Sequence, residues 1–470
     1  MGFVPAVTRS RLYKELPVDR REEHLGLTQK KYLPNIDNFY YNVTLDNDVN
    51  GNERLTALFR ELSAAKEALT KTRSEVEIRP GLFVKPEGHS IYRFCLSSGG
   101  EYDIFITDTL PNHYTPRIHV QLRAYGLWER GVNEILEKSY RVLESLFKEF
   151  DCTVTKCVEN RIDFCFHTNN IQNPNEIFEK RYFERHLKTS LMGGVEYWRL
   201  EKHNGDLDII TNYVGMGDRK SNNIFARFYD KTREVVEMGY KGFFFRIWRE
   251  RGLINAYDEY CLRYAYERKS YSAIHKARLM YYMEHGTDED AKQRIRRVLN
   301  NKNSTSYHYS RCAKAEGLPD VTTVMNIEFQ TMRKFYYNAN IESLPQVYRP
   351  GIPQHLSRLF KIVDNRALFI NYLTDKTVCF VKEKIKNKEP GEKEICCDWW
   401  ERLRHTKLEG IKPDRSFIRE YYSEHDQRAE MRYMVNMPAL NADYSDDTEM
   451  DFGEDVTDFL ACVNDNDYKK

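Results

Sequence analysis

Two acidic residues stand inside apolar runs of the sequence, where a β-strand ordinarily carries none. Asp163 lies in the run 161–166 (RIDFCF), and Glu328 lies between two apolar neighbours in NIEFQTMRKFYYN. Burying a carboxylate is costly unless it is paired or bound to a metal. The two carboxylates could together hold Mg²⁺ or Mn²⁺ through oxygen ligands. Alternatively, Arg161 and Asp163, which strand alternation puts on one face, form a buried structural pair.

Histidines offer only one further candidate ligand, His119 in the run IHVQL. A single histidine in a strand is more often a satisfied core residue, so both interpretations stay open. The 13 histidines include no H-x-H pair and no HExxH motif. The sequence therefore lacks the metal site of histidine-based nickases and of zinc proteases.

Tyr229 is the candidate nucleophile, because the sequence places it among cations. In IFARFYDK, strand alternation points Arg227 and Tyr229 to the same side, and Lys231 follows two residues later. A free phenol titrates near pH 10, so a base, a cation or a metal must activate it before it attacks a phosphodiester. The sequence has 32 tyrosines, and ordinary packing is the alternative role for any one of them.

A glycine-containing turn before that strand carries Arg219, Lys220 and Ser221. Two cations and a hydroxyl in a turn could bind DNA phosphates. The alternative is a solvated hairpin turn without a ligand. No GxxxxGK[ST] motif is present, so the sequence encodes no P-loop ATPase, and no GxSxG motif supports a serine hydrolase.

The elements that must position these residues form an α+β pattern. Alternating runs predict strands in HSIYRFCLS, EYDIFIT, RIHVQLRA, TVTKCVENRIDFCFHT, EYWRLEK, LDIITNYVG, NIFARFYDK and NIEFQTMRKFYYN. Apolar residues at helical spacing predict helices over 53–75, 131–149 and 173–189. We expect an antiparallel sheet with helices on one face, a helical insertion and a mainly helical carboxy-terminal part.

We expect four regions in the chain: an extension with one helix (1–80), an α+β domain (81–340) with a helical insertion at 240–320, a helical region (341–435) and a disordered acidic tail (441–470). The tail holds ten acidic residues and two lysines, whereas the residues before it hold 70 basic and 61 acidic residues, a net charge of +9. A basic body suits a nucleic-acid surface, although ordinary scatter explains it equally well.

The ten cysteines are scattered and form no CxxC pair. They suggest reduced thiols and a cytoplasmic protein. No run of about 18 apolar residues predicts a membrane span.

The order of these segments resembles the Rep_trans family of rolling-circle plasmid replication initiators and conjugative-element relaxases. The resemblance rests on HVQLRAYG, RIDFCFH, YVGMGDRKSNNIFARFYDKTRE, NIEFQTMRKFY and CDWWERL, and it covers about residues 85–430. Its most specific part is the Y-x-G…R-x-S…R-x-Y-D-K phrase.

The resemblance implies roles for individual residues. Tyr229 would be the nucleophile, with Tyr213 as second candidate, and Asp163 and Glu328 would hold Mg²⁺ or Mn²⁺. Arg227 and Lys231 would steady the phosphate, and the turn residues Arg219, Lys220 and Ser221 would grip the DNA backbone. The family often has R-x-E where this chain has Asn326-Ile327-Glu328, so Glu267, four residues after Arg263, is an alternative carboxylate.

The activity implied is nicking of one strand of supercoiled origin DNA on a mobile genetic element. It would leave a 5′-phosphotyrosyl link and a free 3′-OH for rolling-circle replication or conjugative transfer. A host helicase would be a partner, because the chain has no motor, and a homodimer could form. The competing interpretations are a non-catalytic initiator or regulator that only binds origin DNA, and an unrelated interaction scaffold.

Overall fold

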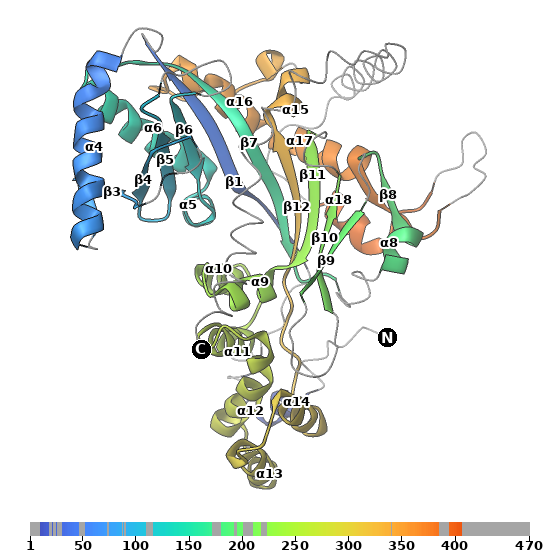
Figure 1. Ribbon diagram of the computed structural model, residues 1–470. Coiled ribbons are helices and arrows are strands. Elements are labelled where there is room, and N and C mark those ends of the chain that lie inside the picture. The colour runs from blue at the N-terminus through green and yellow to red at the C-terminus, as the bar shows by residue number, and fades with distance from the viewer. Residues whose placement is uncertain are drawn as a thin grey trace.

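The computed structural model describes residues 10–17, 21, 25, 31–46, 52–72, 75–86, 88, 91–109, 116–171, 180–191, 195–200, 210–217, 223–339, 341–384 and 394–406. Their centre is one large antiparallel sheet, which runs across Figure 1. Its eleven strands lie in the order β2-β3-β4-β5-β6-β1-β7-β12-β11-β10-β9. In chain order they are β1 (Tyr32–Leu45), β2 (Val76–Arg79), β3 (Leu82–Val84), β4 (Phe94–Ser98), β5 (Tyr102–Ile106), β6 (Ile118–Leu122), β7 (Val154–Thr168), β9 (Val195–Leu200), β10 (Ile210–Met216), β11 (Ile224–Asp230) and β12 (Met325–Met332).

One face of the sheet is apolar and carries the core. Ile162, Phe164 and Phe166 of β7 point to it, as does Phe228 of β11. The helices packed on this face are α4 (Asn52–Thr72), α6 (Val132–Lys148), α16 (Ser357–Asp364), α17 (Arg366–Tyr372) and α18 (Asp398–Arg404). Trp400 of α18 is fully buried and packs on Phe228. The predicted antiparallel sheet with covering helices is thus confirmed.

The opposite face is polar over its central strands, and two β-bulges produce this pattern. In β7, Glu159 faces the helices and pairs with Arg358 of α16, but the register shift beside it turns Arg161 to the other face. In β1, Ile36 and Phe39 both face the core although they are three positions apart. The segment between them, Asp37 and Asn38, therefore contains one residue more than regular alternation allows. An extra residue resets the period-two alternation, and such bulges are common beside active sites.

A helical unit interrupts the sheet between β11 and β12. It comprises α9 (Lys231–Met238), α10 (Phe243–Glu250), α11 (Ala256–Tyr266), α12 (Ile274–His285), α13 (Glu289–Asn300) and α14 (Ser306–Ala315), and it extends below the sheet in Figure 1. Its own core also takes in the short helix α2 (Arg11–Glu15) through Leu12. The unit coincides with the helical stretch expected at 240–320. Among the described residues, no helix is long and apolar enough to cross a membrane.

Three segments differ from the sequence expectation. Residues 32–45, expected in an amino-terminal extension, form β1 at the centre of the sheet between β6 and β7. The strand expected over 326–338 stops at Met332, where β11 no longer provides a partner, and α15 (Arg333–Asn338) follows because a helical turn buries Phe335 and Tyr336 together. The helix expected at 173–189 is α8 (Lys180–His186), and β8 (Leu187–Thr189) then pairs with β13 (Val378–Phe380).

Candidate active site

The polar face brings the predicted residues of three adjacent strands together. β12 lies between β7 and β11, and its register places Glu328 opposite Arg227 on one side and Cys165 on the other. Two residues earlier, Asn326 lies opposite Tyr229. Side chains directly opposite each other in antiparallel strands are close enough to interact. The residues expected from separate sequence motifs therefore form one cluster.

The hydroxyl of Tyr229 is held by three side chains. It donates to Glu328 Oε2 at 3.0 Å, and it accepts from Asn326 Nδ2 at 2.7 Å and from Lys231 Nζ at 3.1 Å. The tyrosine itself is partly exposed, whereas Lys231 and Glu328 are buried. The arrangement gives the phenol an acceptor for its proton and two donors for the oxygen that loses it.

Asp163 lies at the centre of a buried ion-pair network. Arg161 donates to both its oxygens, at 2.9 and 2.7 Å, and Asn38 donates to Oδ2 at 2.9 Å. Arg227 Nη2 lies 3.4 Å from Oδ2 and also contacts Glu328. The structural pair between Arg161 and Asp163 foreseen in the sequence is present, and it is part of the same cluster as the tyrosine.

Burial and charge set the protonation of this cluster. Burial raises the pKa of Glu328 to about 7; Arg227 opposes the shift and Asp163 adds to it. Burial, with the negative charge of Glu328, raises the pKa of Tyr229 well above its ordinary value. Burial would lower the pKa of Lys231, but Asp37 and Glu234 outweigh it and raise this pKa. At neutral pH the phenol therefore keeps its proton until a base takes it, and Lys231 stays charged.

The bulge residue Asp37 fixes Lys231 in place. Its carboxylate lies 3.3 Å from Lys231 Nζ and accepts from Trp128 Nε1 at 2.9 Å. On the other side, Glu234 lies 2.8 Å from the same ammonium group. Lys231 opens α9, whose N-cap is the preceding residue Asp230. A buried ammonium held by two carboxylates is rigid, which suits a group that must stay beside the phenol oxygen.

The oxygen atoms around Glu328 fit a hard cation in their chemistry. Asn326 Oδ1 is buried and has no hydrogen-bond partner among the described residues, and it lies two residues from Glu328 on the same face of β12. Asp163, on the neighbouring strand, shares Arg227 with Glu328. Carboxylate and amide oxygens are the ligands that Mg²⁺ and Mn²⁺ prefer. These oxygen atoms offer the ligand chemistry of Mg²⁺ or Mn²⁺, while both carboxylates are also paired with Arg227.

A second group of potential ligands, Asp37, Cys165 and His167, has donor atoms within 4.8 Å of one another. Trp248 Nε1 donates to His167 Nδ1 at 3.0 Å, so the neutral ring carries its proton on Nε2 and offers no free lone pair. Burial raises the pKa of the Cys165 thiol well above its ordinary value, so the thiol keeps its proton at neutral pH. Thiol and imidazole also favour softer ions than Mg²⁺. This group fits Mg²⁺ and Mn²⁺ less well than the oxygen atoms around Glu328.

The other predicted residues lie in different places. His119 is on the polar face, bonded to Asn42 at 2.7 Å and to Gln121 at 3.2 Å, in a network separate from Glu328. Glu267 ends α11 on the helical unit and is exposed. Tyr213 of β10 lies opposite Tyr229, with ring centroids 6.2 Å apart. Arg219, Lys220 and Ser221, like the acidic tail, lie outside the described residues.

Sequence reasoning missed Asn326 and Asp37. In the sequence, Asn326 stands out only as a departure from an expected arginine. Its position two residues before Glu328 nevertheless predicts that both side chains lie on one face of the strand. Asp37 stands in a Pro- and Asn-rich run that does not alternate. Its role depends on the bulge, which a period-two pattern cannot show.

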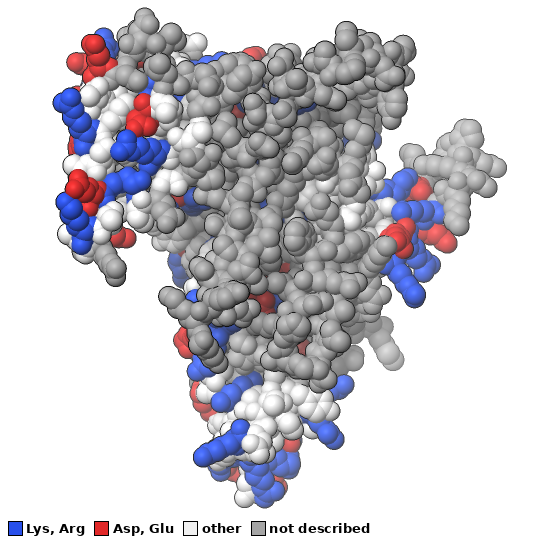
Figure 2. Space-filling model, in the orientation of Figure 1, with Lys and Arg blue, Asp and Glu red and all other residues white. Residues whose placement is uncertain are grey.

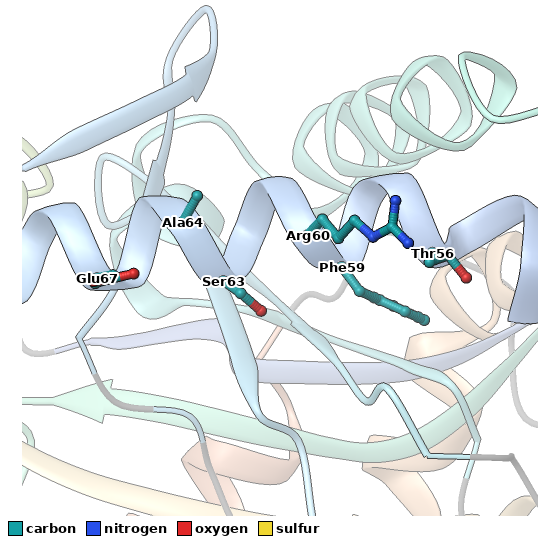
Figure 3. Close-up of a pocket in the computed structure, with 6 residues that line it drawn as sticks. All are labelled: Thr56, Phe59, Arg60, Ser63, Ala64 and Glu67. Atoms are coloured by element: carbon teal, nitrogen blue, oxygen red, sulfur yellow. The ribbon is translucent and has the colours of Figure 1, made fainter.

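A hollow in the described part of the molecule lies away from this cluster. It has a volume of about 400 Å³ and lies along α4, lined by Thr56, Phe59, Arg60, Ser63, Ala64 and Glu67 (Figure 3). All six residues come from one surface helix. It offers no opposing wall of chemical groups, so the site is defined by the cluster at Tyr229 and not by a cavity.

The chain is similar to a solved structure. It is the rolling-circle replication initiator protein from Geobacillus stearothermophilus, at 12% identity and a TM-score of 0.39, covering 79% of this chain and 95% of that chain. No family model and no curated protein matches the chain. At this similarity the function must be argued from the side chains of the chain itself.

Proposed function

We propose that the chain is a DNA-nicking enzyme that uses Tyr229 as its nucleophile, acts at a replication or transfer origin and primes rolling-circle synthesis. The observation that carries the proposal is the environment of the phenol, with Glu328 at 3.0 Å as proton acceptor and Lys231 at 3.1 Å as cation. The order of motifs that resembles the Rep_trans family supports the choice of DNA as substrate.

The proposed reaction is a transfer of one phosphodiester. As Glu328 takes the phenol proton, Tyr229 Oη forms a bond to phosphorus and the bond from phosphorus to the 3′ oxygen breaks. The 3′ oxygen leaves, takes a proton from water and becomes the 3′-OH, while the 5′ phosphate stays on the tyrosine. When that 3′-OH, or the 3′-OH of another strand, attacks the phosphotyrosine, a DNA phosphodiester forms again and Tyr229 is released. This needs no ATP, because the phosphotyrosine bond keeps the energy of the broken phosphodiester.

Three side chains stabilise the charge that develops. Lys231 and Asn326 donate to the phenol oxygen, and Arg227 carries positive charge on the neighbouring strand. Fixed donors aimed at developing charge are usually the largest contribution to such catalysis. Bound Mg²⁺ or Mn²⁺, held by oxygen atoms of Asp163, Asn326 and Glu328, would act as a Lewis acid on a phosphate oxygen.

The second candidate function is origin binding without cleavage. A specific observation favours it: Arg227 already pairs with both Asp163 and Glu328, so this cation is engaged in the protein. Such a protein would bind the same DNA and leave it intact.

The test is covalent capture of labelled DNA. Supercoiled DNA that carries the chain's own origin, labelled just 3′ of the cut so that the label stays with the 5′ phosphate, is incubated with Mg²⁺ or Mn²⁺ and run on a denaturing protein gel. We expect a labelled protein band that is lost in Tyr229→Phe and kept in the matched control Tyr213→Phe. A band that survives in Tyr229→Phe moves the nucleophile, and specific binding without any band supports the binding-only function.

A further inference from the structure

The helical unit between β11 and β12 carries positive charge that the site does not use. From Tyr264 to Lys314 the sequence has eleven Lys or Arg residues and five Asp or Glu residues. Some of these cations form ion pairs, as Arg294 does with Glu316. Arg297 and Arg311, however, are exposed and have no carboxylate partner among the described residues. Figure 2 shows blue side chains around the lower end of the molecule, where Figure 1 places α12 to α14. Unpaired surface cations attract a polyanion.

A hollow of about 230 Å³ lies between α11, α12 and α14. A single water needs only about 10–15 Å³ of such space, so the hollow can admit a much larger group. Its lining combines cations, hydroxyls and aromatic rings: Tyr264, Arg268, Ser272, Ala273, Lys276, Ser306 and Tyr309. No acidic side chain lines it, which makes it complementary to a phosphate.

Each aromatic ring of this hollow is paired with a cation. The guanidinium carbon of Arg268 lies 3.5 Å from the ring centroid of Tyr264, and Lys276 Nζ lies 5.8 Å from that of Tyr309. Tyrosine faces beside arginine and lysine are what proteins use to hold unpaired bases and the phosphates between them.

A neighbouring face of α14 continues the same chemistry. Tyr307, Arg311 and Lys314 are spaced by four and three residues, so they lie on one face of the helix. Tyr307 is 68% exposed, and its ring meets that of the neighbouring His308 edge-on, so most of the tyrosine surface faces solvent. Together with the hollow, this face makes a strip of cations and tyrosines.

The topology connects this strip to Tyr229. The chain leaves the sheet after Asp230 and returns at Met325, and the N–H groups of Lys231 and Thr232 both donate to Val324 O at the junction. The two strands that support the helical unit are therefore the two strands that carry the nucleophile and Glu328. DNA bound to the unit is held on the same structural support as the reacting phenol.

We propose that the helical unit is a second DNA-contact surface, which holds a single strand through the cations and tyrosines of the hollow and of the outer face of α14. The identity of that strand as the one cut at Tyr229 rests on the proposed function. Its binding does not, because the contacts lie outside the catalytic cluster.

Binding is measured with the chain carrying Tyr229→Phe, so that no covalent link forms. The probe is a fluorescent oligothymidylate of roughly 16 nucleotides, titrated at several salt concentrations. The hollow is tested by Arg268→Gln/Lys276→Gln and the outer face by Tyr307→Ala. The matched control is Arg60→Gln/Lys148→Gln, which removes two exposed cations of α4 and α6.

We expect the hollow variant to bind about tenfold more weakly, with the slope of log affinity against log salt reduced by about 1.4, because each phosphate contact on a single strand contributes about 0.7. Tyr307→Ala should weaken binding at least about fivefold with little change of slope, since stacking is uncharged. The control pair should bind as the parent does.

Equal binding by the hollow variant and the control pair would overturn the proposal. Duplex DNA that binds as tightly as the single strand, with the same sensitivity to the variants, would overturn the single-strand assignment. If the chain with intact Tyr229 forms no covalent adduct while the hollow variant still loses binding, the proposed nuclease activity is wrong. The proposed single-strand surface would still stand.

Discussion

Arg227 lies directly opposite Glu328 in the ladder between β11 and β12, and its guanidinium also lies 3.4 Å from Asp163. One cation thus serves two buried carboxylates from different strands. Removing it should leave Glu328 without its guanidinium partner, while Asp163 keeps Arg161 and Asn38.

Arg227→Met is therefore expected to lower the free energy of unfolding by roughly 3–5 kcal/mol, the usual cost of breaking a buried pair. Urea denaturation measures the change. Arg246→Met is the control, because its ion pair with Glu129 is half exposed and should contribute less than about 1 kcal/mol. Equal stability of the two variants would mean that the ion-pair network is not formed in solution.

Glu328→Gln removes the proposed proton acceptor and leaves the shape of the side chain nearly unchanged. We expect the rate of adduct formation to fall about 10²- to 10⁴-fold, the usual contribution of a general base, with DNA affinity nearly intact. Rapid-quench sampling of the labelled band gives the rate. Glu342→Gln, at an exposed carboxylate, is the control, and a Glu328→Gln rate like that of the control would remove Glu328 from the reaction.

Asn326→Leu tests the metal ion through a side chain that does not carry charge. The substitution removes Oδ1, for which the described part of the chain offers no partner, and also the hydrogen bond to Tyr229. We expect Mn²⁺ binding, measured by calorimetry, to weaken by about 10- to 100-fold, as for other residues that support a metal site. Unchanged Mn²⁺ affinity, together with loss of affinity in Cys165→Ser, would place the ion on the group formed by Asp37, Cys165 and His167 instead.

His167 should make the protein sensitive to mild acid. Burial lowers the pKa of His167 to about 3, against an ordinary value of 6.5. Below pH 6.5 the unfolded chain binds a proton that the folded chain does not, so the free energy of unfolding falls as pH falls. Between pH 7 and pH 5 the loss should approach about 2 kcal/mol.

Thermal or urea unfolding of the parent and of His167→Gln measures this acid sensitivity. Glutamine keeps an acceptor for Trp248 but does not titrate. Between pH 7 and pH 5 the free energy of unfolding of His167→Gln should therefore fall by about 2 kcal/mol less than that of the parent. Parallel curves for the two proteins would show that His167 is accessible to protons in the folded state.

The sequence predicted the parts of the fold that follow a simple period. The strands β4 to β6 and the helix α6 carry regular alternation or helical spacing, and the structure has them close to their expected places. It also put Arg227 and Tyr229 on one face of a strand, because β11 alternates without interruption.

What the sequence did not reveal depends on bulges and on long-range register. Asp37 reaches Lys231 only because β1 has an extra residue there, and Asn326 meets Tyr229 only through the pairing of β12 with β11. The central place of β1 also depends on pairing with strands that lie far away in the sequence. A single sequence carries no signal for such pairing, because its local patterns are identical for a central strand and for an edge strand.

The central position of β1 has a consequence for how the protein is made. Tyr40 pairs with Gln121 on one side and with Arg161 on the other, about 80 and 120 positions later in the chain. At roughly 5–20 residues per second, a ribosome finishes β7 several seconds after β1 has emerged. Until then the edge of β1 that faces β7 has no strand partner, and the two halves of the sheet can join only once β7 has paired with β1. Nascent chains of this protein should therefore need protection by chaperones until β7 is complete.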